Sequence, residues 1–193
     1  MDTEKLNRWA KVIHDNATAH GWHEEKHSPE NWLSLIMCEV AEAIEADRKD
    51  EYFLSNRQGP GVIQHETFRM NGLIEKGEIN EFIEVFEYYV KGTVNEEFAD
   101  IVIRLLDMAV ELFGKYDFGQ PKKIIKPSMN MSFSETAWFF VTSILTFHKD
   151  FINEAILFMY EWAGQLGIDL DQHIEWKMKY NESRPYKHGG KKY

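Results

Sequence analysis

Apolar residues recur at three- and four-residue spacing along nearly the whole chain, between residues that start and stop helices. No run of residues alternates between apolar and polar side chains as a half-buried strand does. The sequence therefore predicts an all-α fold, and the 193 residues fit a single domain, residues 1–193. The expected helices cover residues 2–20, 29–48, 63–91 (in pieces, interrupted at Gly72 and Gly77), 93–113, 132–148, 150–166 and 169–183.

The segment His23-Glu24-Glu25-Lys26-His27 matches the H-E-x-x-H pattern of zinc metalloproteases. That pattern binds zinc only on a helix, where both histidines share one face. Gly21 is typical of a helix end, and Ser28 followed by Pro29 is typical of a helix start. The connection between them is too short to hold a helix. We therefore expect a chance match and look for the chemistry elsewhere.

Composition narrows the class of protein. The net charge of −10 argues against a broad nucleic-acid-binding surface. Cys38 is the only cysteine, which rules out an internal disulfide and a zinc site built from several cysteines, and fits a reducing compartment. The sequence starts without an apolar signal segment, and it contains no apolar stretch of membrane-span length. We expect a cytoplasmic protein with no membrane partner.

Two of the expected helices carry acidic residues on apolar faces. Glu39 and Glu42 lie three apart in WLSLIMCEVAEAIEA, and Glu97 and Asp100 repeat the spacing in VNEEFADIVIRLLDMAVELF. Residues three apart are neighbours on one helix face, and a bare carboxylate on an apolar face is costly unless it is paired or metal-bound. Asp107 lies two turns beyond Asp100, on the same side. Four carboxylates from two packed helices, with no nearby histidine, predict an oxygen-only site for Mg²⁺ or Mn²⁺.

The acidic residues also have two other interpretations, an ordinary salt bridge and a di-iron site. Arg104 follows Asp100 by four residues and could form an ordinary salt bridge with it. A helix-bundle di-iron site needs Glu-x-x-His pairs, and the only such pair is Glu24-x-x-His27 in the connection already set aside. Two acid pairs in two nearly apolar helices favour a metal site over either alternative.

The order of these motifs resembles the all-α NTP pyrophosphohydrolases, the MazG-like superfamily that includes dimeric dUTPases. The resemblance depends on EVAEAIEA, on EEFADIVIRLLDMA and on the C-terminal GIDLDQHIEWKMKYNESRPYKHGGKK. It covers about residues 1–48, 93–113 and 163–192. Residues 49–92 and 114–162 depart from the compact family pattern, and we expect them to be insertions in a helical bundle of this type.

The resemblance implies that Glu39, Glu42, Glu97 and Asp100 bind Mg²⁺, with Glu96 as a helper. Such enzymes hydrolyse a nucleoside triphosphate to a monophosphate and pyrophosphate. The residue chemistry agrees, because cations on phosphate oxygens offset charge and lower the pKa of an attacking water. Glu39 or Glu42, if not saturated by metal, would accept the proton of that water. The alternative is a helical regulatory protein that keeps the metal site and senses nucleotides without turnover.

The last expected helix carries polar residues suited to phosphate. Lys177 and Asn181 are four apart on one face, and Arg184 lies about one turn further along. Without the resemblance, these residues read as a solvated basic helix end. With it, they are expected to bind substrate phosphates. The segment His188-Gly189-Gly190-Lys191-Lys192 is either a cap that closes on ligand or a plain tail.

Recognition of the base has the weakest support in the sequence. Trp22 and Trp32 flank the connection after the first helix and could stack on a nucleobase, although aromatic residues at helical spacing are more often core. Asn16 and His20 are further candidates for contacts with base or sugar. The sequence does not identify the nucleotide.

Two expected helices in the second insertion, residues 132–148 and 150–166, have apolar faces but no acid pair. Short MazG-like chains bury their apolar faces by assembling at least as dimers, so a homodimer or higher oligomer is expected. In this chain, the extra pair of helices is either a metal-free substitute for a partner subunit or a lobe covering an outer surface.

Overall fold

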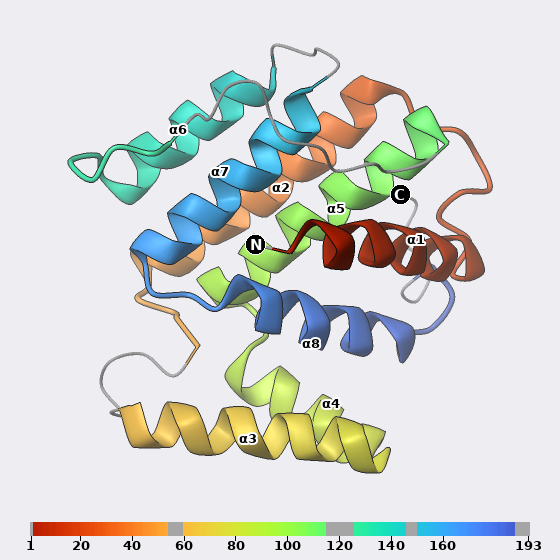
Figure 1. Cartoon of the computed structure of the whole chain (residues 1–193), viewed down its shortest axis with the longest axis vertical. Helices are drawn as coiled ribbons and strands as arrows, with labels where there is room; N and C mark the ends of the chain where they lie inside the picture. Colours follow the sequence, from red (N-terminus) through yellow and green to blue (C-terminus); the bar gives the residue numbers. More distant parts are fainter. Residues whose placement is uncertain (1, 54–59, 115–125, 146–149, 188–193) are drawn as a thin grey trace.

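The computed structural model describes residues 2–53, 60–114, 126–145 and 150–187, and every regular element among them is an α-helix (Figure 1). The all-α prediction is confirmed for these residues. The helices are α1 (Thr3–Ala19), α2 (Pro29–Arg48), α3 (Pro60–Lys76), α4 (Ile79–Tyr89), α5 (Val94–Phe113), α6 (Phe133–Ile144), α7 (Phe151–Gln165) and α8 (Leu170–Glu182).

The helix boundaries follow the expected start and stop residues, except at Gly72 and at the start of α3, which begins at Pro60 and not at residue 63. The Ser28 side chain accepts a hydrogen bond from the backbone N–H of Asn31, and Asp169 does the same for Gln172. The expected interruption at Gly72 is wrong, since α3 runs through it. Buried packing of the neighbours Met70 and Leu73 offsets the cost of a helical glycine, which is about 1 kcal/mol. The break comes at Gly77 alone, whose φ of 74° ends the helix.

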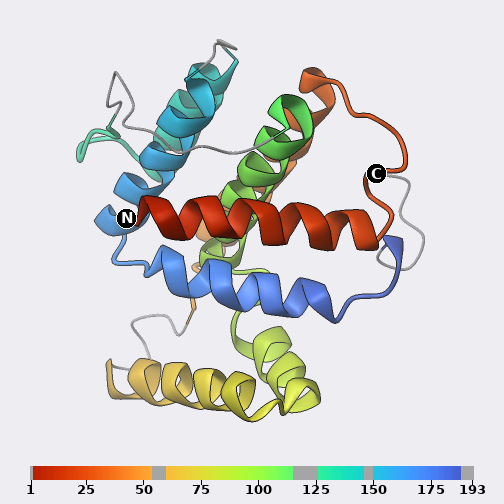
Figure 2. The ribbon, with the colours of Figure 1, turned by 45° about the vertical axis from the view of Figure 1, so that its right-hand side comes forward.

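The central helix of the fold is α5. Helices α1, α2, α7 and α8 all pack against it, and α1 and α8 run side by side across it (Figures 1 and 2). Its apolar side chains form the middle of the main core, and the fully buried ones include Val94, Phe98, Ile101, Val102, Leu105, Leu106 and Met108. Because α5 is enclosed on several sides, any acidic residue along it must be paired, protonated or metal-bound.

The first insertion, residues 49–92, contributes α3 and α4, which lie together below α8 in Figure 1. They form a second, smaller core with α8, in which Phe82, Phe86 and Trp176 are fully buried. The indole N–H of Trp176 donates to the side-chain oxygen of Asn71 at 2.8 Å. The insertion therefore supports α8 from the side opposite α1.

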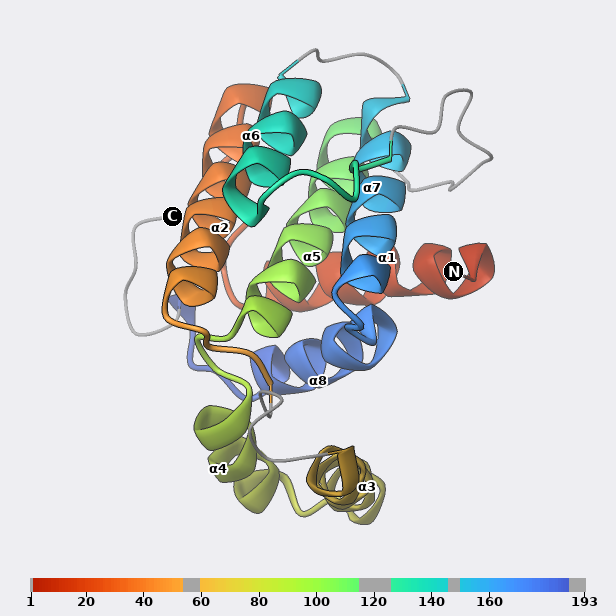
Figure 3. The ribbon, with the colours of Figure 1, turned by 90° about the vertical axis from the view of Figure 1, so that its left-hand side faces the viewer.

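The second insertion, residues 114–162, contributes α6 and most of α7. Helix α6 packs on α2, and α7 packs on α5, so both cover the helices that carry the acid pairs (Figure 3). Residues 146–148 of the expected helix 132–148 lie outside the described residues. This packing is common to the substitute-subunit and outer-lobe interpretations. Within the described part of the chain, no helix combines the length and the apolar character needed to cross a membrane.

Candidate functional site

Helices α1, α2, α5 and α8 enclose a cavity of about 610 Å³. Small-molecule sites in proteins have volumes of about 300–1,000 Å³, so a nucleotide-sized ligand fits this range. Every site residue that the sequence predicts lines this one cavity: Asn16, His20, Trp22, Trp32, Glu39, Glu42, Glu96, Glu97, Asp100, Lys177, Asn181 and Arg184. The cap at residues 188–192 lies outside the described residues.

The carboxylates of Glu39, Glu42 and Glu97 form the acidic part of the cavity. One oxygen of each lies within 4.8 Å of the others, a spacing that could hold a metal ion. Glu39 and Glu97 are 6% and 5% exposed, whereas Glu42 lies on the open side of the cluster. The i, i+3 spacing and the packing of α2 on α5 thus gather three of the four predicted ligands.

The fourth predicted ligand, Asp100, contacts a lysine instead. Lys177 Nζ lies 2.7 Å from Asp100 Oδ2, and it also forms an ion pair with Glu96 Oε1. Lys177 is only 5% exposed, so the interpretation of this residue as part of a solvated basic helix end is wrong. Its ammonium group lies among carboxylates, where it offsets part of their mutual repulsion.

Arg104 supplies a second positive charge to the cluster. The sequence alternative pairs it with Asp100 along the same helix, but its Nε donates to Glu39 Oε1 on α2. Arg104 and Lys177 therefore flank the acids from two sides. Five carboxylates, those of Glu39, Glu42, Glu96, Glu97 and Asp100, line this part of the cavity against these two cations.

Burial and like charges shift the protonation of the acidic cluster. Burial raises the pKa of Glu97 to about 9, and the neighbouring carboxylates, Asp100 foremost, reinforce the shift. Burial also raises the pKa of Glu39, an effect that Asp100 strengthens and Arg104 opposes. Without a metal ion, Glu97 thus retains its proton at neutral pH. All of the donors in the cluster are oxygen atoms, the ligands that Mg²⁺ and Mn²⁺ prefer, so a hard divalent cation fits it.

This pKa shift predicts a pH dependence of stability and of Mg²⁺ binding. Because the folded chain binds the Glu97 proton more tightly than the unfolded chain does, the metal-free free energy of unfolding should fall between about pH 5 and pH 9. Mg²⁺ competes with that proton, so its affinity should rise over the same interval. Melting curves at several pH values, with and without saturating Mg²⁺, measure both effects. A Mg²⁺-induced shift of equal size at each pH would contradict the prediction.

The aromatic part of the cavity lies toward the C-terminal half of α5. Trp32 is 4% exposed, and its ring centroid lies 5.7 Å from that of His27. Trp22 is half-buried in the connection between α1 and α2. Trp32 is thus a core residue that also lines the cavity, and its stacking on a nucleobase stays a prediction. On α1, the backbone oxygen of Asn16 lies 2.7 Å from His20 Nδ1.

The segment after α8 folds over the connection between α1 and α2. His20 Nε2 lies 2.9 Å from the backbone oxygen of Arg184, and Lys187 Nζ forms an ion pair with Glu24 at 2.6 Å. The Tyr186 ring packs so closely on Gly21 that a Cβ there would lie 2.4 Å from it, and the Gly21 φ of 81° also favours glycine. These contacts hold Arg184 at the cavity.

The connection between α1 and α2 contains no helix, as expected from Gly21 and Ser28. The H-E-x-x-H metalloprotease geometry is therefore absent at residues 23–27. Glu24, the general base in such a motif, is exposed and bonded to the C-terminal segment.

Asp107, which is expected two turns beyond Asp100 on the same side of the helix, lines the same cavity, but its carboxylate contacts two histidines and not the acidic cluster. Its Oδ1 lies 2.8 Å from His14 Nδ1 and 2.9 Å from His23 Nε2. These pairs join residues 93 and 84 positions apart in the chain, so no local spacing could reveal them. Sequence reasoning missed both His14 and the neighbouring Glu111.

Comparison of the chain with family models, with curated proteins and with solved structures finds no match. The assignment of a function therefore depends on the motifs and on the geometry of this cavity.

Proposed function

We propose that the chain is a Mg²⁺-dependent nucleoside triphosphate pyrophosphohydrolase that releases a nucleoside monophosphate and pyrophosphate in nucleotide-pool house-cleaning. The observation that carries this proposal is the composition of a single cavity. Carboxylates suited to divalent cations, a guanidinium and an amide suited to phosphate, and aromatic rings suited to a base all line it. The motif order that resembles the MazG-like enzymes supports the same activity.

The acidic cluster would repel a triphosphate unless its charge were changed. When Mg²⁺ is bound there, it would reverse the local field, neutralise phosphate oxygens and acidify an attacking water. Glu39, Glu42 and Glu97 would hold the ion, because one carboxylate oxygen of each lies close to the others. Asp100 is connected to this group through its ion pair with Lys177. Glu42, on the open side of the cluster, is placed to accept the proton of the water.

Helix α8 offers the phosphate-binding groups. The side-chain NH₂ group of Asn181 is the part of this amide that can donate to phosphate, whereas its buried oxygen, which makes no hydrogen bond with any described residue, can accept only from a ligand N–H or O–H. The guanidinium of Arg184 lies 5.8 Å from the Tyr180 ring, a cation–π contact that orients it. Lys177 forms ion pairs with Glu96 and Asp100, so it connects α8 directly to the acidic cluster.

A product assay tests this activity. The purified chain is incubated with canonical and damaged ribo- and deoxyribonucleoside triphosphates, with Mg²⁺ or with a chelator. We expect equal amounts of monophosphate and pyrophosphate from at least one nucleotide, and none in chelator. Release of orthophosphate would indicate a phosphatase. Mg²⁺-dependent binding without any product would favour the alternative, a nucleotide-sensing regulatory protein. Neither binding nor product would contradict both.

A further inference from the structure

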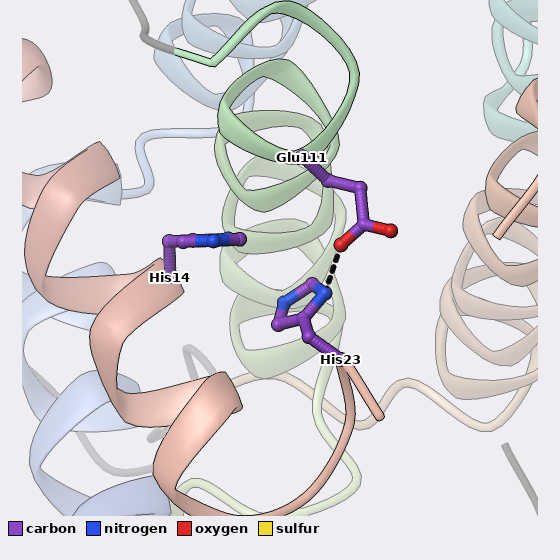
Figure 4. A group of neighbouring side chains, drawn as sticks. All are labelled: His14, His23 and Glu111. Atoms are coloured by element: carbon purple, nitrogen blue, oxygen red, sulfur yellow. Dashed lines mark ion pairs between the residues drawn. The ribbon is translucent and has the colours of Figure 1, made fainter. Parts of the chain in front are cut away.

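A second polar cluster lies beside the cavity, toward the C-terminal half of α5. It combines His14 from α1, His23 from the connection between α1 and α2, and Asp107 and Glu111 from α5; Figure 4 shows His14, His23 and Glu111 converging. The side chains of His23, Asp107 and Glu111 are 7%, 9% and 10% exposed. These polar groups are thus largely withdrawn from water, and each needs a partner.

Asp107 sets the tautomers of both histidines. Its Oδ1 faces His14 Nδ1 at 2.8 Å and His23 Nε2 at 2.9 Å. A carboxylate oxygen only accepts hydrogen bonds, so the hydrogen-bond network assigns a proton to each of those nitrogens. In a neutral imidazole, the other nitrogen then carries a lone pair. His14 Nε2 and His23 Nδ1 are therefore the nitrogens able to act as ligands.

A positively charged species beside His23 Nδ1 would stabilise its environment. This buried nitrogen forms an ion-pair contact with Glu111 Oε2 that lacks hydrogen-bond geometry (Figure 4). If His23 is neutral, its lone pair faces a carboxylate oxygen, which is repulsive unless a positive species joins the two. That species is either a proton or a metal ion. One nitrogen of each histidine and one oxygen of Glu111 lie within 4.8 Å of one another, which supplies three converging donors.

We propose that His14, His23 and Glu111 form a transition-metal site of the zinc type, separate from the carboxylate cluster, with Asp107 orienting both imidazoles. Two imidazoles and a carboxylate suit Zn²⁺ and its neighbours in the transition series, whereas Mg²⁺ prefers oxygen alone. A carboxylate that accepts the second N–H of a ligating histidine is a recurrent feature of zinc sites. This site differs from H-E-x-x-H, since His14 takes the place of His27, and Glu24 is engaged at the surface.

The position of the site indicates a structural role. It joins the connection between α1 and α2 to both α1 and α5, and that connection carries Trp22 and His27, which line the cavity. A metal ion here would hold the aromatic wall in place without touching the acidic cluster. The proposal does not depend on the proposed hydrolase activity.

Metal binding by the whole chain tests the site. Chelator-treated protein is dialysed against Zn²⁺ in a large excess of Mg²⁺, and bound zinc is measured by elemental analysis. We expect a single zinc ion per chain and a higher melting temperature. Co²⁺ in place of Zn²⁺ should give the visible absorption of a nitrogen- and oxygen-ligated ion of low coordination number. Absence of bound zinc and of a Co²⁺ spectrum in the wild-type chain would overturn the proposal and leave a proton between His23 and Glu111.

Variants locate the ion. His14→Gln, His23→Gln and Glu111→Gln should each lower zinc affinity by at least about 100-fold, and Asp107→Asn by about 10- to 100-fold. His27→Gln is the matched control on the same connection, and it should bind zinc like the wild type. Glu97→Gln should also retain zinc, which separates this site from the Mg²⁺ cluster. Zinc binding that survives both histidine substitutions, or that is lost in His27→Gln, would contradict the assignment.

Discussion

Replacement of Glu97 by glutamine is expected to abolish pyrophosphate release and Mg²⁺-induced stabilisation while the helices remain folded. Glutamine has nearly the same shape, but it cannot carry the negative charge that a cation requires at this buried position. Metal stabilisation of the transition-state charge is worth several kcal/mol, so turnover should fall by at least about 1,000-fold. The variant should also lose most of the decline in stability with rising pH, because the group whose pKa is raised to about 9 is gone.

Glu39→Gln and Asp100→Asn should also reduce turnover, as Glu97→Gln does. Glu45→Gln is the matched control, since Glu45 lies on the exposed side of α2 and pairs only with Arg48 and Lys49 among the ion partners described. Its melting temperature, Mg²⁺ response and product release should match those of the wild type. Product release in Glu97→Gln and Glu39→Gln at the wild-type rate would refute the assignment of the acidic cluster as the metal site.

Features that depend on neighbouring residues in the chain could be predicted from the sequence. The i, i+3 spacing of Glu39 with Glu42 and of Glu97 with Asp100 places each pair on one helix face, whatever the rest of the fold does. Periodic apolar residues and the N-cap at Ser28 fixed the helices to within a few residues. The expected break at Gly72 failed because packing against α4 and α8 outweighs the weak intrinsic preference of glycine.

Features that depend on packing between helices could not be predicted in this way. Arg104 is four residues from Asp100, yet its guanidinium donates to Glu39 on α2, because that carboxylate is buried at the helix interface. Asp107 has the right spacing to join the acidic cluster, but His14 on α1 and His23 in the connection after α1 lie against it. All three partners, Glu39, His14 and His23, lie at least 65 residues away in the chain.

Glu96 shows the competition between local and tertiary partners. The sequence Thr93-x-x-Glu96 predicts a capping box, and the Thr93 hydroxyl does accept the backbone N–H of Glu96 at 3.3 Å. The carboxylate does not return to the backbone N–H of Thr93, however, and instead contacts Lys177 and the backbone N–H of Gly92. A charged partner in a buried site attracts the carboxylate more strongly than a neutral N–H does.

Replacement of Lys177 by alanine is expected to cause a large loss of stability. Lys177 is the buried cation between Glu96 and Asp100, so its removal leaves two carboxylates unpaired. Breaking a buried pair in this way costs about 3–5 kcal/mol, which corresponds to a fall in melting temperature of about 6–20 °C for a chain of this size. The fall should be larger at alkaline than at acidic pH, because burial raises the pKa of Glu96, and its protonation removes the repulsion from Asp100.

Mg²⁺ should restore part of the stability of Lys177→Ala, since a divalent cation can replace the lost charge among the carboxylates. Pyrophosphate release should not recover with it, because the lysine that holds Glu96 and Asp100 in position is still missing. Lys179→Ala is the control two residues along α8: its side chain is 32% exposed and pairs with Glu182, a surface contact worth less than about 1 kcal/mol. If Lys177→Ala has the same melting temperature and the same rate of nucleotide turnover as Lys179→Ala, then Lys177 neither neutralises the acidic cluster nor contributes to the reaction.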